Sequence, residues 1–329
     1  MIEVIMVGQR IIFCSLLLLL PTFVDAKIVF LSRGVGPAYL HVMDDDGRNS
    51  IRLINYSWPS WPVWSPDGKQ IAFSKSLPPG PKGGQREAIV IINNDGSNEH
   101  RLTDDQDDNL NRNRLFETSC DWSPDGQYIA FDSVRSGRAE IWTINLKTKS
   151  LRQLTDTDGL STFPSWSPDG KYIAYRDDPP RGFSTIYAML SNGDRQRELA
   201  PGDSELRRNF PRWSLDSQSV VYTEETFRLV GGQYRNVLDK VVIHNINTDK
   251  RQIVDTPDNW SIHSACYMGS NLLLISAKSK DGNPDKFEFY QFNLVTGKIV
   301  RLTNTPTNEY IMDWISDDVL PVLPKGKKK

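Results

Sequence analysis

The sequence is poor in the residue types that catalytic and metal-binding sites use most. It contains three cysteines and four histidines in 329 residues. The histidines are His41, His100, His244 and His263. His41 and His244 fall on the predicted third strands of separate repeats, and neither has a neighbouring His or Cys at ligand spacing. The sequence also lacks a G-x-S-x-G nucleophile elbow, an H-E-x-x-H pair and a P-loop. We therefore predict a protein that is not an enzyme and that requires no cofactor.

An excess of charge of either sign is also missing. The chain has 39 basic and 41 acidic residues, and no basic face or RNA-binding signature stands out. This balance argues against nucleic acid as a partner. Two Asp-rich turns, Asp44–Gly47 and Asp156–Gly159, resemble fragments of calcium loops but do not continue to a distal bidentate Glu. The first occupies the turn position at which other repeats have Asn94-Asp95-Gly96 or Ser191-Asn192-Gly193, so turn chemistry explains it.

Only one long hydrophobic run is present, and it lies at the N-terminus. Arg10 precedes an apolar stretch from Ile11 to Val24, which ends in Val24-Asp25-Ala26. Because the run is short and ends in small residues, we predict a signal peptide over residues 1–26, with an uncleaved anchor as the alternative. We expect a periplasmic or extracellular protein, without stable membrane insertion after removal of the leader. A basic tail over residues 324–329 is expected to be solvated.

A ten-residue phrase occurs four times in the remaining chain. It reads WSPDGKQIAF from Trp64, WSPDGQYIAF from Trp122, WSPDGKYIAY from Trp166 and WSLDSQSVVY from Trp213, at spacings of 58, 44 and 47 residues. Each copy predicts a tight turn followed by an alternating strand. The spacing is typical of propeller blades and too long for helical-pair repeats. We interpret the tryptophans as structural anchors between blades.

A second phrase, a short apolar strand, a polar turn and a further strand, occurs six times. The copies are Tyr39–Ile54, Ala88–Thr103, Glu140–Thr155, Thr185–Ala200, Lys240–Asp255 and Glu288–Thr303. A degenerate fifth hairpin places Cys266 at the tryptophan position, and a sixth is split between Trp314 near the C-terminus and Ile28–Leu31. We therefore predict an all-β, six-bladed propeller of four-stranded antiparallel blades over residues 27–323. The terminal strands share one blade, which removes open sheet edges.

Two cysteines, Cys120 and Cys266, remain outside the leader. They fall in the second and fifth complete blades, on opposite sides of the predicted channel, whereas a disulfide needs Cα atoms within about 7 Å. We predict two buried free thiols.

The phrase W-S-P-D-G-K-x-I-A-F, with its following I-Y…G…L-T strand pair, resembles the repeat of TolB-type propellers of bacterial envelopes. The resemblance covers nearly the whole chain after the leader and implies a six-bladed propeller with partners in the cell envelope. TolB carries an additional α/β domain before its propeller, whereas the first predicted strand here follows the leader directly. The resemblance thus implies a stand-alone propeller that binds a protein or peptide.

The long connections of the predicted propeller all lie on one face of the disc. They are Lys75–Glu87, Asp104–Ser119, Arg176–Ser184, Gly202–Asn209, Glu224–Asp239 and Lys278–Lys286. Function concentrates in long loops on a rigid scaffold, so we place the interaction surface on this long-loop face and at the channel mouth. Aromatic residues and arginine are enriched at interface hot spots. The candidate residues are Trp58, Trp61, Asp104, Asp107, Arg112, Arg114, Arg207, Arg208, Phe227, Tyr234 and Arg235.

The alternative hypothesis is a metal-dependent hydrolase or lactonase that acts in the channel, as in gluconolactonase-like propellers. Such a site requires several inward-facing oxygen ligands at the ends of the inner strands. The weak candidates are Glu117, Asn209, Asn259 and Glu309, which come from four different blades.

Overall fold

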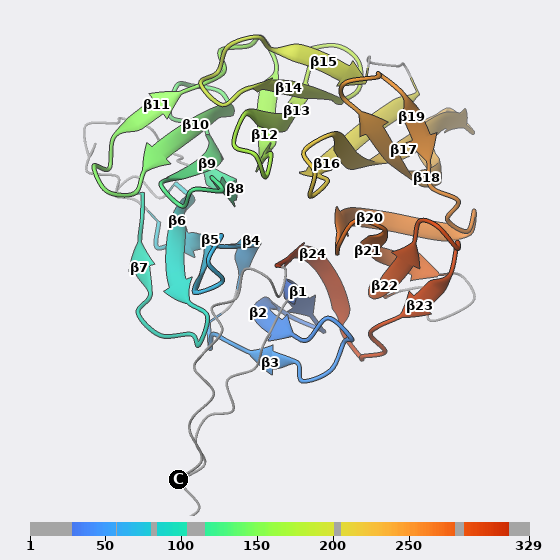
Figure 1. Cartoon of the computed structure of the whole chain (residues 1–329), viewed down its shortest axis with the longest axis horizontal. Coiled ribbons are helices and arrows are strands. Elements are labelled where there is room, and N and C mark those ends of the chain that lie inside the picture. Colours follow the sequence, from blue (N-terminus) through green and yellow to red (C-terminus); the bar gives the residue numbers. More distant parts are fainter. Residues whose placement is uncertain are drawn as a thin grey trace, which may run out of the picture.

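The computed structural model describes residues 28–56, 58–79, 84–103, 116–200, 205–279 and 286–315. Within these ranges all regular structure is β-strand, arranged as six four-stranded antiparallel sheets around an axis (Figure 1). The prediction of a six-bladed all-β propeller is therefore confirmed. No helix in the described part of the chain has the length and apolarity needed to cross a membrane.

The blades are numbered in chain order, and each runs from an inner strand at the axis to an outer strand at the rim. Blade 1 contains β24 (Asn308–Trp314), β1 (Ile28–Arg33), β2 (Ala38–Met43) and β3 (Ile51–Arg52). Blade 2 contains β4 (Pro59–Trp64), β5 (Gln70–Leu77), β6 (Arg86–Asn93) and β7 (His100–Arg101). Blade 3 contains β8 (Glu117–Trp122), β9 (Tyr128–Ser133), β10 (Glu140–Asn145) and β11 (Leu151–Gln153).

Blade 4 contains β12 (Leu160–Trp166), β13 (Tyr172–Asp178), β14 (Thr185–Leu190) and β15 (Arg197–Ala200). Blade 5 contains β16 (Leu206–Trp213), β17 (Ser219–Val230), β18 (Gln233–Asn245) and β19 (Arg251–Ile253). Blade 6 contains β20 (Trp260–Tyr267), β21 (Leu272–Ser279), β22 (Glu288–Asn293) and β23 (Ile299–Arg301).

Blade 1 closes the ring with strands from both ends of the propeller. β24 pairs antiparallel with β1, with Ile28 opposite Trp314 and Arg33 opposite Asn308. This pairing confirms the predicted split blade. It covers the inner edge of β1 with β24, which limits pairing of β1 with other chains.

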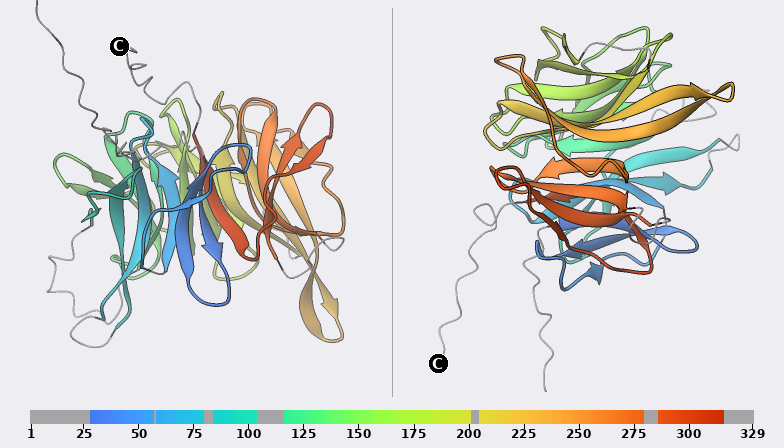
Figure 2. Two further views of the ribbon diagram at one scale, coloured as in Figure 1. Left: turned by 90° about the horizontal axis from the view of Figure 1, so that it is seen from below. Right: turned by 90° about the vertical axis from the view of Figure 1, so that its right-hand side faces the viewer.

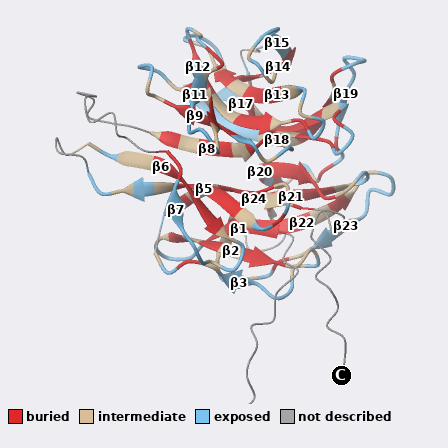
Figure 3. Ribbon diagram, turned by 60° about the vertical axis from the view of Figure 1, so that its left-hand side comes forward, coloured by how far each residue is buried: buried red, intermediate tan, exposed pale blue. Residues whose placement is uncertain are grey.

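The hydrophobic core lies between neighbouring blades, because the alternating strands bury apolar side chains on both faces of each sheet. Trp64 packs among Val29 and Leu40 of blade 1 and Phe73 and Val90 of its own blade. Trp122 and Trp213 occupy equivalent clusters, and all three indoles are at most 6 % exposed. Trp166 and Trp314 are half-buried against the clusters of their own interfaces. Figure 3 shows the buried inner strands and the exposed rim.

The Ser-Pro-Asp-Gly turns repeat one hydrogen-bond pattern. Ser65 Oγ donates to Asp67 Oδ1 at 2.7 Å, and Asp67 Oδ1 also accepts the backbone N–H of Lys69 at 3.1 Å. Gly68 adopts a φ of 66° at the fourth turn position, and its N–H donates to the Ser65 carbonyl at 2.9 Å. In the fourth copy Ser217 takes this place with a φ of 60°, a conformation that costs a residue with a Cβ.

These short turns share one face of the disc, which we call the short-turn face, and the opposite face carries the connections between the second and third strands. The predicted loop Glu224–Asp239 is wrong, because β17 and β18 continue through it to a two-residue Gly231-Gly232 turn. Both glycines have positive φ, as a tight hairpin requires. This hairpin projects from the long-loop face (Figure 2).

Cys120 and Cys266 are buried free thiols, as predicted. They lie in blades 3 and 6, on opposite sides of the ring. Burial raises the pKa of the Cys266 thiol to about 12 and raises that of Cys120 as well.

Candidate functional site

A cavity of about 370 Å³ lies at the end of the channel, on the short-turn face. All six blades contribute to it, because each inner strand ends here before its turn. The lining residues used below are Asp121, Arg212, Asp313, Trp166, Leu215 and Trp314. The volume falls within the range of ligand-binding clefts.

The floor of the cavity is formed in five of the six blades by the residue that precedes the tryptophan position, and these residues are Asp313, Asp121, Ser165, Arg212 and Cys266. The prediction that Cys266 holds the tryptophan position is wrong, because Tyr267 pairs with Leu273 as Trp166 pairs with Ile173, which puts Cys266 one residue earlier. Arg212 Nη1 lies 3.8 Å from Asp121 Oδ1. The floor thus brings together three charged groups from three blades that are not neighbours.

The two carboxylates also join blades. Asp121 Oδ2 accepts the backbone N–H of Trp166 in blade 4 at 2.7 Å. Asp313 Oδ2 accepts the backbone N–H of Trp64 in blade 2 at 2.8 Å. One oxygen of each carboxylate is thereby held by the next blade, which fixes the position of the floor.

Burial dominates the electrostatics of the floor. It raises the pKa of the Asp121 carboxyl to about 7, opposed by Arg212 and reinforced by the negative charge of Asp313. Burial likewise raises the pKa of Asp313. Burial lowers the pKa of Arg212, but the two carboxylates outweigh it, so the net shift is upward. The Asp121 carboxyl therefore ionises as the pH rises through about 7, which adds one negative charge to the floor.

The wall of the cavity is aromatic. Trp213 is fixed in place, because its Nε1 donates to the carbonyl of Ser165 in the preceding blade at 2.9 Å and Tyr172 stacks on its ring. Trp166 and Trp314 are half-buried and Leu215 is 45 % exposed at the rim. The arrangement offers apolar surface around a charged centre, which suits a side chain with a charged end.

Beyond the floor, toward the long-loop face, a layer of rings fills the channel. Trp61, Phe163 and Phe210 contact one another at centroid distances of 4.5 to 5.3 Å. His263 stacks on Phe210 at 5.0 Å and contacts Tyr310 at 5.7 Å. A space of about 20 Å³ separates this layer from Arg212. The cavity is therefore a blind recess rather than a pore.

A bulge in each of the inner strands β4, β12 and β16 turns an aromatic side chain of this layer toward the axis. Trp61, Phe163 and Phe210 have φ values of 54°, 55° and 56°, in the left-handed region that non-glycine residues seldom occupy. The pairing register shifts at the same place in each of the three strands. Burial lowers the pKa of His263 to about 4, so this ring is neutral at physiological pH.

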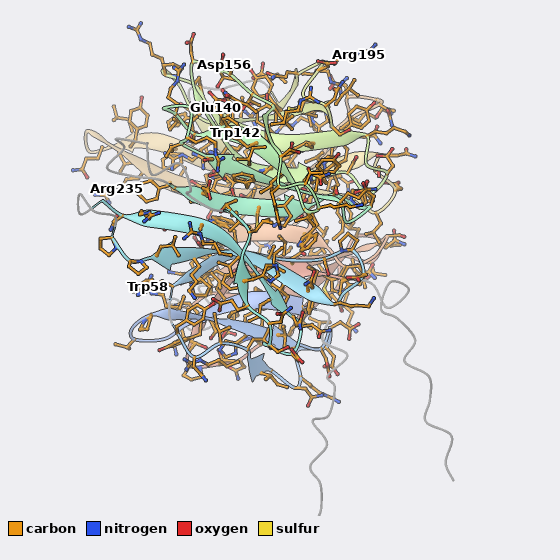
Figure 4. All side chains as sticks on the ribbon, turned by 90° about the vertical axis from the view of Figure 1, so that its left-hand side faces the viewer. Trp58, Glu140, Trp142, Asp156, Arg195 and Arg235 are labelled. Atoms are coloured by element: carbon orange, nitrogen blue, oxygen red, sulfur yellow. The ribbon has the colours of Figure 1, made fainter. Side chains whose placement is uncertain are left out.

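The predicted binding residues that the structure describes do not all lie on one surface. Asp104, Asp107, Arg112 and Arg114 lie outside the described residues. Trp58 is 51 % exposed with Arg33 over its ring, whereas Trp61 belongs to the channel layer. The Figure 4 view places Trp58 and Arg235 on the same side of the disc, away from Arg195.

Adjacent arginines of β16 have opposite environments. Arg208 is only 2 % exposed, and its Nε donates to Glu224 Oε2 at 2.9 Å inside blade 5. Arg207 faces out, with its guanidinium 4.9 Å from the ring centroid of Phe227. Because successive side chains of a strand point to opposite faces, Arg208 is structural and unavailable to a partner. Tyr234 and Arg235 are exposed on the β17–β18 hairpin.

The metal candidates are each engaged within the propeller framework. Glu117 forms a buried ion pair with Arg135, and Glu309 accepts hydrogen bonds from Thr305 and Thr307 at 2.7 Å. Asn209 Nδ2 donates to Glu225 at 3.0 Å, and Asn259 is half-buried before β20. In the described part of the chain, no three His, Cys, Asp or Glu side chains are grouped so as to hold a metal.

The sequence analysis missed Asp121, Arg212 and Asp313. A signal was available, since these charged residues all stand directly before the repeat tryptophan.

Comparisons with known proteins agree with this architecture. A family profile described as TolB beta propeller domain matches residues 21–231. An uncharacterized protein of Agrobacterium fabrum is 27 % identical over 201 residues, covering 57 % of this chain and 62 % of the relative. The Tol-Pal system protein TolB of Alcanivorax borkumensis is 29 % identical over 122 residues, covering 36 % of this chain and 25 % of the relative. The chain thus spans less than two thirds of either relative.

Solved structures show the same fold. TolB from Acinetobacter baumannii has a TM-score of 0.66 at 19 % identity, with 88 % of this chain and 66 % of that chain covered. A putative TolB from Agrobacterium tumefaciens has a TM-score of 0.58 at 16 % identity, with 89 % and 99 % covered. An oligogalacturonate lyase in complex with manganese has a TM-score of 0.57 at 12 % identity, with 84 % and 74 % covered. The fold is therefore shared by TolB proteins and by a lyase.

Proposed function

Because the chain belongs to the TolB beta propeller domain family, we propose that it is a non-enzymatic module that binds a protein or peptide at the mouth of its channel. The observation that carries this proposal is the blind recess to which all six blades contribute, with Asp121, Arg212 and Asp313 at its floor. A recess closed by the aromatic layer has no exit for a passing solute. It suits a protruding segment that enters and stops.

The chemistry of the recess supports a peptide as ligand. Tryptophan and arginine are the residue types that contribute most to binding energy at protein interfaces. The rim offers Trp166, Trp314 and Leu215 as apolar contacts, and the floor offers charge and hydrogen-bonding capacity. The volume of about 370 Å³ accommodates a few side chains of an inserted segment.

We also propose a cellular location for the protein. One relative is named as a Tol-Pal system protein, and the N-terminal residues 1–26 have the pattern of a signal peptide. Both support a periplasmic or extracellular protein with a partner in the cell envelope.

A photo-crosslinking experiment tests which face binds. Leu215 at the recess rim and Leu160 at the start of β12 are 45 % and 43 % exposed and lie on opposite faces. Each is replaced separately by a photoreactive phenylalanine analogue, and cross-linked envelope proteins are identified. We expect a specific adduct from position 215 and none from position 160. The adduct from position 215 should be lost when R212E is added, under conditions in which circular dichroism shows that the R212E variant is folded. Adducts from position 160 alone would move the binding surface to the long-loop face, and none from either would contradict the proposal.

The enzymatic alternative has its own test. A metal-dependent hydrolase of the gluconolactonase-like type requires a stoichiometric divalent cation, whereas a binding module does not. Elemental analysis of the purified protein, with calcium and zinc titration, separates the two. Stoichiometric metal with a raised unfolding temperature would favour the enzyme and justify a lactone and ester screen.

A further inference from the structure

The β17–β18 hairpin is the most protruding regular element of the described chain. The pairing of β17 with β16 ends at Leu206–Thr226, but β17 and β18 continue paired with each other as far as Val230 and Gln233. Four residue pairs therefore extend past the sheet, about 13 Å at the rise of a β-strand. Figure 2 shows the hairpin reaching beyond the long-loop face.

The end of the hairpin is apolar and exposed. Leu229 and Tyr234 face each other across the strands and are 65 % and 63 % exposed. Val230 and Val237 are each 46 % exposed. Single exposed apolar residues are normal on a protein surface, but four within nine positions on a projection mark an interaction site.

The same end is basic. Arg228 stands directly opposite Arg235 in the pairing register, and both side chains are exposed. Like charges in directly opposite positions destabilise a strand pair. The segment from Thr226 to Leu238 contains no Asp or Glu. An anionic partner would offset this repulsion.

The base of the hairpin is fixed. Phe183, from the connection before β14, stacks on Phe227 at 5.5 Å, and the Arg207 guanidinium lies 4.9 Å from the same ring. Arg207 Nη1 also lies 3.9 Å from Glu225. The apolar end is therefore presented on an ordered support.

We propose that this hairpin end docks on an anionic lipid surface. Leu229, Val230 and Tyr234 enter the headgroup region, while Arg228 and Arg235 contact lipid phosphates. The tip is convex and exposed on both faces, so it fits a soft layer that it can enter better than a preformed pocket. Apolar side chains next to arginines are the residue combination of interfacial membrane anchors. The recess opens on the opposite face, so docking leaves it accessible.

Vesicle co-sedimentation of the purified full chain tests this proposal. The vesicles contain phosphatidylcholine alone or with 30 mol% phosphatidylglycerol as an anionic lipid. Two variants probe the hairpin. R228E/R235E reverses its basic charge. L229S/V230S removes apolar surface and leaves the basic charge unchanged. The control R48E/R195E makes the same charge change at exposed turn residues of the short-turn face.

We expect binding to anionic vesicles that is at least about 10-fold weaker for R228E/R235E, since each basic residue near a charged membrane contributes measurably. L229S/V230S is expected to bind more weakly than wild type, and R48E/R195E like wild type. Absence of wild-type binding, or equal loss in R48E/R195E and R228E/R235E, would overturn the proposal. Circular dichroism and unfolding curves establish that each variant is folded. The recess experiment is independent of this outcome.

Discussion

Trp61 and Phe210 belong to blades 2 and 5, on opposite sides of the ring, yet their ring centroids lie 5.3 Å apart. The contact therefore crosses the channel axis. It makes the middle of the propeller a packed core, and the recess on the short-turn face ends against it.

This contact is expected to stabilise the fold. W61A and F210A should each lower the free energy of unfolding by about 2 to 3 kcal/mol, because large apolar surface is removed from a partly buried layer. The double variant should show a coupling of about 1 kcal/mol, typical of an aromatic pair. Urea unfolding measures all three. W58A, at an exposed tryptophan, is the control and should change stability by less; a coupling near zero would mean that the rings do not act together.

Arg212 is expected to be essential for the stability of the channel floor. Replacing it by methionine leaves Asp121 and Asp313 without their positive neighbour, and losing one partner of a buried charge group costs about 3 kcal/mol. Adding D121N to R212M should recover at least about 1 kcal/mol, because one unpaired charge is then removed. Chemical denaturation checks both values. R195M, at an exposed turn arginine, is the matched control and should stay within about 0.5 kcal/mol of wild type.

Asp121 should make stability depend on pH. Its pKa is about 7 in the folded protein, against a usual 3.8. Between these values the folded state binds the proton more tightly, so this group's contribution lowers stability as the pH rises from about 4 to about 7. D121N removes that contribution. The difference in unfolding temperature, D121N minus wild type, should therefore increase as the pH rises across this range. Calorimetry at several pH values measures it. A difference that stays constant with pH would contradict the raised pKa of Asp121.

Ser217 replaces the glycine of the other three turns. Its φ of 60° costs a residue with a Cβ, but its Oγ accepts the backbone N–H of Asp169 at 3.0 Å. S217A loses the bond and keeps the strain, so it should cost about 1 kcal/mol. S217G loses the bond and relieves the strain, so it should be about 1 kcal/mol more stable than S217A. Thermal unfolding of the pair checks the difference; equal stabilities would mean that the turn is unstrained.

Much of the fold followed from local patterns. The four tryptophan phrases predicted blade spacing and turn type, and Ile28–Leu31 predicted the shared blade, because periodicity and turn chemistry act within a few residues. The extension of β17 and β18 had a local signal too, in Gly231-Gly232 between alternating strands, which a long loop would not need.

The candidate site was harder to predict from the sequence than the fold. Asp121, Arg212 and Asp313 are far apart in the chain, and only ring closure brings their blades to one axis. Arg207 and Arg208 are adjacent and chemically alike, yet strand alternation sends one outward and one inward. The bulge between Asn209 and Arg212 then resets that alternation and turns Phe210 to the axis, which a strict two-residue period does not predict.

The closing blade sets an order of events during synthesis. Ser32 of β1 hydrogen-bonds Glu309 of β24, which is 277 residues later in the chain. At typical ribosomal rates that interval lasts roughly 14 to 55 seconds. For all of this time β1 has no inner neighbour, and from its own synthesis onward Trp64 lacks the Asp313 oxygen, 249 residues later, that accepts its N–H. The last inner strand to emerge is thus the one that completes the ring, and a nascent chain must be kept from pairing elsewhere until it arrives.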